Sequence, residues 1–66
     1  MNINKLKGKI TEKGLSVEKL AALIDIDRST LYRKLDKGEK ITIGEARKMR
    51  DALSLTEEEA TAIFFG

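Results

Sequence analysis

Two short amphipathic segments separated by a single turn, within residues 16–37, constrain the fold of this chain most strongly. Between Val17 and Ile24 apolar residues recur at intervals of three and four, which predicts one buried face of a helix. A second helix follows, with Leu31 and Leu35 as its buried residues. Helices this short are unstable alone in water, so the pair must share a core with the rest of the chain.

Polar and small residues before, within and between these two helices favour their capping, a tight turn and close packing. Ser16 and Asp27 each precede a helix, and their side chains can accept hydrogen bonds from its free backbone N–H groups. Asp25 tolerates a left-handed backbone better than most residues do, although less easily than Gly. Ala21 is small enough for the second helix to cross close over the first.

The outward face of the second helix carries side chains that can bind DNA. At 100° per residue, four of them fall on one arc away from the leucines: Arg28, Ser29, Tyr32 and Arg33. Their guanidinium, hydroxyl and phenol groups can bond base edges or phosphates. A helix, a tight turn and a second helix with polar residues near its start form the helix-turn-helix arrangement that contacts the major groove. An ordinary solvated helix face is the alternative interpretation.

Residues 15–35, with the capped helix that begins near Thr42, resemble the DNA-binding domain of the Cro and phage-repressor superfamily. More narrowly, the runs NKLKGKI, STLYRKL and EEEATAIFF are similar to small Cro-like regulators of temperate phages of Gram-positive bacteria. The resemblance spans nearly the whole chain. It implies that residues 1–66 form one all-α, five-helix, lambda-repressor-like domain that binds double-stranded operator DNA as a weak homodimer.

The resemblance also assigns contacts by position. Base contacts fall on the four residues of the outward arc, and Ser16 and Thr30 would lie near phosphates. Three residues depart from the family pattern: Val17 replaces a frequent Gln, Asp25 a frequent Gly, and Asp27 a frequent Ser or Thr cap. The two carboxylates leave the affinity for DNA open.

A charged loop follows the second helix and would pass along the phosphate backbone. Lys37 and Lys40 could each neutralise a phosphate there, and Gly38 could offer an exposed backbone N–H. A solvated turn is an equally good interpretation for either lysine. Asp36 adds a further carboxylate near the same face.

Three more helices complete the prediction. The first covers residues 2–13, and the two that follow the loop begin at capping boxes, in which Thr42 pairs with Glu45 and Thr56 pairs with Glu59. The fourth helix has an apolar stripe that we expect in the core: Ile43, Ala46, Met49 and Leu53.

Leu55 and Phe65 are the candidates for a dimer interface. Phe65 lies off the buried face of the last helix, and large exposed apolar residues can mark an interaction surface. Singly exposed apolar residues are equally common on monomers. A dimer through these residues would separate the two DNA-contacting helices by roughly 34 Å, one turn of B-DNA.

Composition narrows the classes of function. The chain has no Cys and no His, so the commonest nucleophiles, general bases and zinc ligands are missing. We therefore expect no enzyme, no cofactor, no metal and no small-molecule ligand. No apolar run approaches the ~20 residues of a membrane span, which predicts a cytoplasmic protein of the bacterial host without a membrane partner.

Charge is unevenly distributed along the chain. Residues 1–50 hold all 13 lysines and arginines against seven acids, a net charge of +6, whereas residues 51–66 have a net charge of −4. This pattern suits a polyanion partner, although helical proteins that never bind nucleic acid also show it.

The main hypothesis is a sequence-specific DNA-binding regulator, a Cro-like repressor that keeps polymerase off an overlapping promoter. The alternative is a protein-interaction module, an anti-repressor or antitoxin that has kept the fold.

Overall fold

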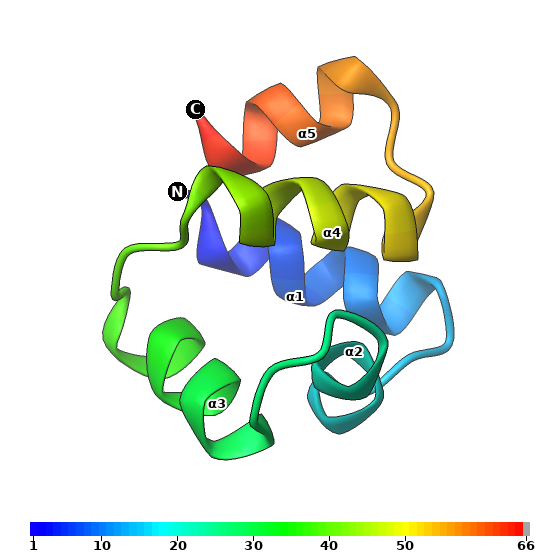
Figure 1. Ribbon diagram of the computed structural model, residues 1–66. Helices are drawn as coiled ribbons and strands as arrows, with labels where there is room; N and C mark the ends of the chain where they lie inside the picture. The colour runs from blue at the N-terminus through cyan, green and yellow to red at the C-terminus, as the bar shows by residue number, and fades with distance from the viewer. Residues whose placement is uncertain (66) are drawn as a thin grey trace.

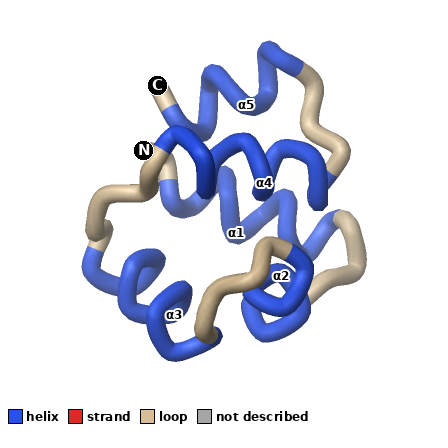
Figure 2. The backbone as a smooth tube through the Cα atoms, in the orientation of Figure 1, coloured by secondary structure: helices blue, strands red, loops and turns tan. Residues whose placement is uncertain are grey.

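The computed structural model describes residues 1–65, which form five helices and no strand. Their bounds are α1 (Ile3–Glu12), α2 (Val17–Leu23), α3 (Arg28–Lys37), α4 (Ile43–Leu53) and α5 (Glu57–Phe64). Short loops join them (Figure 2). The predicted all-α, five-helix architecture is confirmed. None of these helices has the length and apolar character that a bilayer span requires.

The helices are arranged so that α2 and α3 lie at one end of the molecule. In the view of Figure 1 they are at the bottom, α5 is at the top, and α1 and α4 lie between. Helix α2 packs against both α3 and α4, and α1 packs against α5. The backbone N–H of Asn2 donates to the carbonyl of Ile63 at 2.6 Å, which brings the two ends of the chain together.

Every helix begins at a residue whose side chain accepts from a backbone N–H two or three positions later. These caps are Asn2, Ser16, Asp27, Thr42 and Thr56. Both predicted capping boxes are present, because Glu45 and Glu59 also accept from the backbone N–H of their own caps. Such caps satisfy backbone donors that would otherwise lack a partner at each helix start.

Left-handed residues end four of the helices. Gly14 and Gly38 have φ values of 72° and 64°, and the non-glycine residues Asp25 and Ser54 have 58° and 52°. After each of them the chain turns back, and the next backbone N–H donates to a carbonyl five residues earlier. This bond is typical of a Schellman motif, which stops a helix and redirects the chain toward the core.

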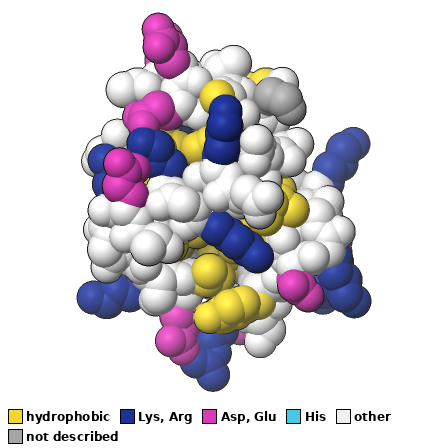
Figure 3. All heavy atoms as spheres, turned by 180° about the vertical axis from the view of Figure 1, so that it is seen from behind, with side chains coloured by type: hydrophobic (Ala, Val, Ile, Leu, Met, Phe, Trp, Pro, Cys, Tyr) yellow, Lys and Arg dark blue, Asp and Glu magenta, His cyan; other side chains and the backbone are white. Residues whose placement is uncertain are grey.

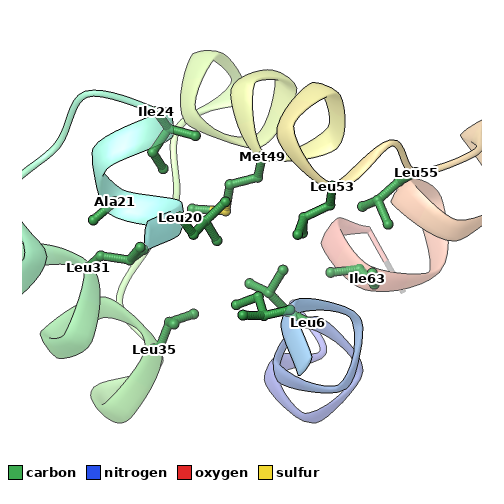
Figure 4. Close-up of a cluster of buried hydrophobic side chains, with 11 residues drawn as sticks. Leu6, Leu20, Ala21, Ile24, Leu31, Leu35, Met49, Leu53, Leu55 and Ile63 are labelled. Atoms are coloured by element: carbon green, nitrogen blue, oxygen red, sulfur yellow. The ribbon is translucent and has the colours of Figure 1, made fainter. Parts of the chain in front are cut away.

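The core draws apolar side chains from all five helices, and Figure 4 shows them converging on one interior. Its largest fully buried members are Leu6, Leu20, Ile24, Leu31, Met49, Leu53 and Ile63. Because each short helix contributes only one or two of these, none could bury its apolar face without the others.

Two expectations about burial are wrong. Ile43, expected in the core stripe of α4, is 67% exposed, because it is the first residue of the helix and that turn extends beyond the core. Leu55, expected at a dimer interface, is 8% exposed and packs in the core. Its backbone N–H donates to the carbonyl of Arg50, and this bond turns its side chain inward after α4.

An ion pair joins α1 to α5. The Lys9 ammonium contacts the carboxylates of Glu12 and Glu59. Hydrogen bonds from Lys9, followed by one from the backbone of Thr56, lower the pKa of Glu59 from 4.5 to about 2. The same two carboxylates raise the pKa of Lys9, that of Glu12 having the larger effect.

Candidate nucleic-acid interface

The turn between α2 and α3 has a defined backbone geometry. The N–H of Asp25 donates to the carbonyl of Ala22 at 3.3 Å, and the N–H of Ile26 donates to the carbonyl of Ala21 at 3.0 Å. These are the two bonds of a Schellman motif, with Asp25 as its left-handed residue. Asp27 then accepts from the N–H of Ser29 at 3.1 Å and starts α3. The direction in which α3 leaves α2 is thus set by local bonds.

Helix α3 has one face in the core and one face exposed. Leu31 is fully buried and Leu35 is 3% exposed, and both point toward the interior in Figure 4. The four residues predicted to contact bases are all exposed: Arg28, Ser29, Tyr32 and Arg33. No other segment of residues 1–65 covers them. The structure therefore brings the predicted base-contacting residues together on one accessible helix face.

The predicted phosphate-contacting residues are not all on this face. Ser16 caps α2 by accepting from the N–H of Lys19 at 3.1 Å, and Thr30 is half-buried in the first turn of α3. Lys37 is exposed in the last turn of α3. Lys40, also exposed, lines a hollow at the opposite side of the loop, beside α4 and α5. The structure thus groups Lys37 with the base-contacting residues and leaves Lys40 apart.

A hollow between α1, α2 and α3 adds a residue that the sequence analysis missed. Lys7 of α1 lines it together with Tyr32, Arg33 and Lys37 of α3. Three cations and one acidic residue, Asp36, line this concave surface, and the excess of positive charge favours an anion such as a phosphate. In the sequence, Lys7 lies off the apolar stripe of the first helix, which marks it only as a surface residue. Nothing in the sequence places it beside α3.

Each exposed arginine of α3 already has a carboxylate partner. Arg28 Nη1 donates to Glu18 Oε1 of α2, and Arg33 Nε lies 3.2 Å from Glu39 Oε2 in the loop after α3. The arginine side chains remain 65% and 54% exposed in these pairs. Exposed pairs contribute about 0–1 kcal/mol, so another anion can replace the carboxylates.

The side chain of Lys34, the residue after Arg33, points toward α4 and not into solvent. Its ammonium donates to both carboxylate oxygens of Glu45 in α4, at 2.8 and 2.9 Å, and both side chains are more than four-fifths buried. These bonds, with a further one from the backbone of Thr42, lower the pKa of Glu45 below its ordinary value. Lys34 therefore ties α3 to α4 and is not free for a ligand.

Charges of both signs are mixed over the surface. On the face shown in Figure 3, lysine and arginine side chains lie at the left, right and lower edges and in the middle, with acidic side chains among them and at the top. The molecule thus offers no broad cationic field on this face, and nucleic-acid binding would depend on the local set of groups on α3.

Exposed apolar side chains gather on the surface formed by the loop after α3, the start of α4 and the end of α5. Ile43 and Phe65 are 67% and 74% exposed, and with the half-buried Phe64 they line two adjoining hollows beside α4 and α5. Met1 borders one of these hollows and Arg47 the other. Phe65 thus remains a candidate interface residue, whereas the buried Leu55 does not.

Comparison of the chain with protein-family models, curated proteins and solved structures gives no match. Within residues 1–65, no three acidic side chains come together in a way that could hold a metal ion.

Proposed function

We propose that the protein is a sequence-specific DNA-binding regulator that places α3 in the major groove. The exposed polar face of α3 carries the proposal: Arg28, Ser29, Tyr32 and Arg33 lie together on a helix that Leu31 and Leu35 anchor in the core. Guanidinium groups bond guanine O6 and N7, and hydroxyl groups bond several base edges. Lys37 and Lys7 flank this face and suit the phosphates beside the groove.

The proposed mode of action is occupancy of an operator. A weak homodimer through the surface where Ile43 and Phe65 are exposed would present two copies of α3 to a near-palindromic site. Two-fold proteins of this kind bind half-sites roughly 34 Å apart. A bound dimer would keep polymerase off an overlapping promoter, as a Cro-like repressor does.

Selection of bound duplexes from a random pool tests the proposal. We expect a preferred half-site, and Arg28→Ala and Arg33→Ala should each lower the affinity for it by about 1–3 kcal/mol and relax the preference at one base pair. Lys48→Ala is the matched control, because it removes one positive charge from an exposed position of α4 that lines neither the hollow beside α3 nor those beside α5. Equal losses in all three variants would contradict the assigned face.

A protein-interaction module, such as an anti-repressor or antitoxin, is the second candidate. It is favoured by the exposed carboxylates of Asp25, Asp27 and Asp36 around α3, since these repel phosphates. Titration with random-sequence duplex at low and moderate salt separates the two. A DNA-binding protein should bind random duplex at low salt and lose affinity steeply as salt rises. Absence of binding at low salt would favour the protein partner.

A further inference from the structure

The two arginines proposed to contact bases are held by glutamates that use different nitrogens of the guanidinium. Glu39 lies against Nε of Arg33, at 3.2 Å, whereas Glu18 accepts from the terminal Nη1 of Arg28. The glutamates also come from different segments, Glu18 from the first turn of α2 and Glu39 from the loop after α3.

This difference matters because guanine is recognised by two parallel N–H groups of one guanidinium. With Glu39 at Nε, both terminal nitrogens of Arg33 are free to reach O6 and N7 while the ion pair is kept. In Arg28 the carboxylate of Glu18 lies at one of these two terminal nitrogens and competes with the base for it. One carboxylate is therefore compatible with base contact, and the other competes with it.

The backbone around Glu39 supports a positioning role. Gly38 adopts a left-handed φ of 64°, and the N–H of Glu39 then donates to the carbonyl of Lys34 at 3.0 Å. This turn and its hydrogen bond hold Glu39 beside the last turn of α3, close to Arg33, and limit the positions that its carboxylate can occupy. A guanidinium held on one edge loses less side-chain freedom when it meets a base.

We infer that Glu39 is a positioning residue that orients Arg33 toward a guanine, and that Glu18 lowers affinity by competing with DNA for Arg28. The inference rests on the proposed function, and it adds which residues determine the selectivity of DNA binding. Glu39 raises the ratio of specific to random affinity. Glu18 lowers affinity for both kinds of duplex.

The test compares the parent protein with Glu39→Gln and Glu18→Gln on the selected duplex and on random duplex. Glu57→Gln, an exposed acid at the start of α5, is the control for the change in net charge. Relative to this control, Glu39→Gln should lower the ratio of specific to random affinity about two- to fivefold. Glu18→Gln should raise both affinities about two- to fivefold and leave the ratio unchanged.

Glu39→Asp separates geometry from charge, because the shorter side chain keeps the carboxylate but withdraws it from Nε. We expect it to lower the ratio as Glu39→Gln does. Equal ratios and affinities in all the variants, with specific binding by the parent, overturn this inference alone. If the parent binds no duplex, the proposed function and this inference both fail.

Discussion

On α3, the neighbouring residues Arg33 and Lys34 are held in different ways. Lys34 is 15% exposed and makes two short hydrogen bonds to Glu45, whereas Arg33 is 54% exposed and has a single contact with Glu39. A step of 100° around the helix separates the two side chains. This rotation places the Lys34 ammonium between α3 and α4 and the Arg33 guanidinium in solvent.

The comparison shows how one short helix can serve both stability and binding. A largely buried ammonium with two charged hydrogen bonds is costly to remove, because its partner would be left without compensation. An exposed guanidinium gains little from its pair and can exchange it for a phosphate or a base. The buried face of α3 should therefore govern folding, and the exposed face should govern recognition.

The largest effect should come from Leu31→Ala. Leu31 is fully buried, so the variant loses apolar contacts and leaves a cavity, at a cost of about 2–5 kcal/mol in the free energy of unfolding. Urea denaturation followed by circular dichroism measures it. Tyr32→Ala, one position along and 51% exposed, should change the same quantity by less than about 0.5 kcal/mol. Similar losses in both variants would mean that α3 is rotated from this orientation.

A smaller loss of stability should follow from breaking the pair between α3 and α4. Glu45→Ala removes the partner of Lys34 and half of a capping box, and should cost about 2 kcal/mol. Lys34→Met keeps the capping box and should cost about 1 kcal/mol. Neither variant should alter which duplex is selected. A change of base preference in Lys34→Met would show that Lys34 faces the DNA.

Among the exposed cations, Lys37 should affect DNA binding without affecting base preference. Lys37→Ala should weaken binding to selected and random duplex alike and reduce the slope of log affinity against log salt by about 1. Lys40→Ala is the comparison, since Lys40 lines the hollow beside α4 and α5 and should change the slope less. If Lys40→Ala had the larger effect on the slope, the phosphate path would run along the loop instead of along α3.

The smallest effect should be a loss of stability at acidic pH. It should arise from the ion pair between Lys9 of α1 and Glu59 of α5. The pKa of Glu59 in the folded protein is lowered from 4.5 to about 2. The unfolded state therefore binds a proton more readily, and the stabilisation is fully present above pH 4.5 and lost as the pH falls toward about 2.

The measurement is the thermal midpoint of unfolding at pH 6 and at pH 3. The decrease between them should be smaller in Glu59→Gln than in the parent, because the variant has no proton to bind at this site. Glu58→Gln, in the same turn of α5, should behave like the parent. A decrease of the same size in Glu59→Gln and the parent would assign the acid sensitivity to other carboxylates.

The helix boundaries could be predicted because they depend on nearby residues. Ser16, Asp27 and Thr42 cap helices through bonds to N–H groups two or three positions away. The left-handed backbone at Asp25 depends on its own side chain and on the end of α2. The exposure of Ser29, Tyr32 and Arg33 followed from periodicity once the leucines of α3 were assigned to the core. Arg28 lies seven residues before Leu35, and it is exposed as the first residue of the helix.

The errors have a common cause. Ile43 has the spacing of a core residue, and Leu55 follows a helix end as an interface residue could. Whether either is buried depends on how far the neighbouring helices extend, and periodicity within one segment contains no information on that. The carboxylate partners of the arginines were missed for the same reason.

By itself, the sequence determined five capped helices and the residues on the outward face of α3, since caps and helical spacing act over a few positions. Only the tertiary structure decided that Lys7 lies beside α3, that Lys34 faces Glu45, and that Arg28 and Arg33 hold their glutamates by different nitrogens. These contacts join different segments of the chain, and their distances are set by helix packing around the shared core.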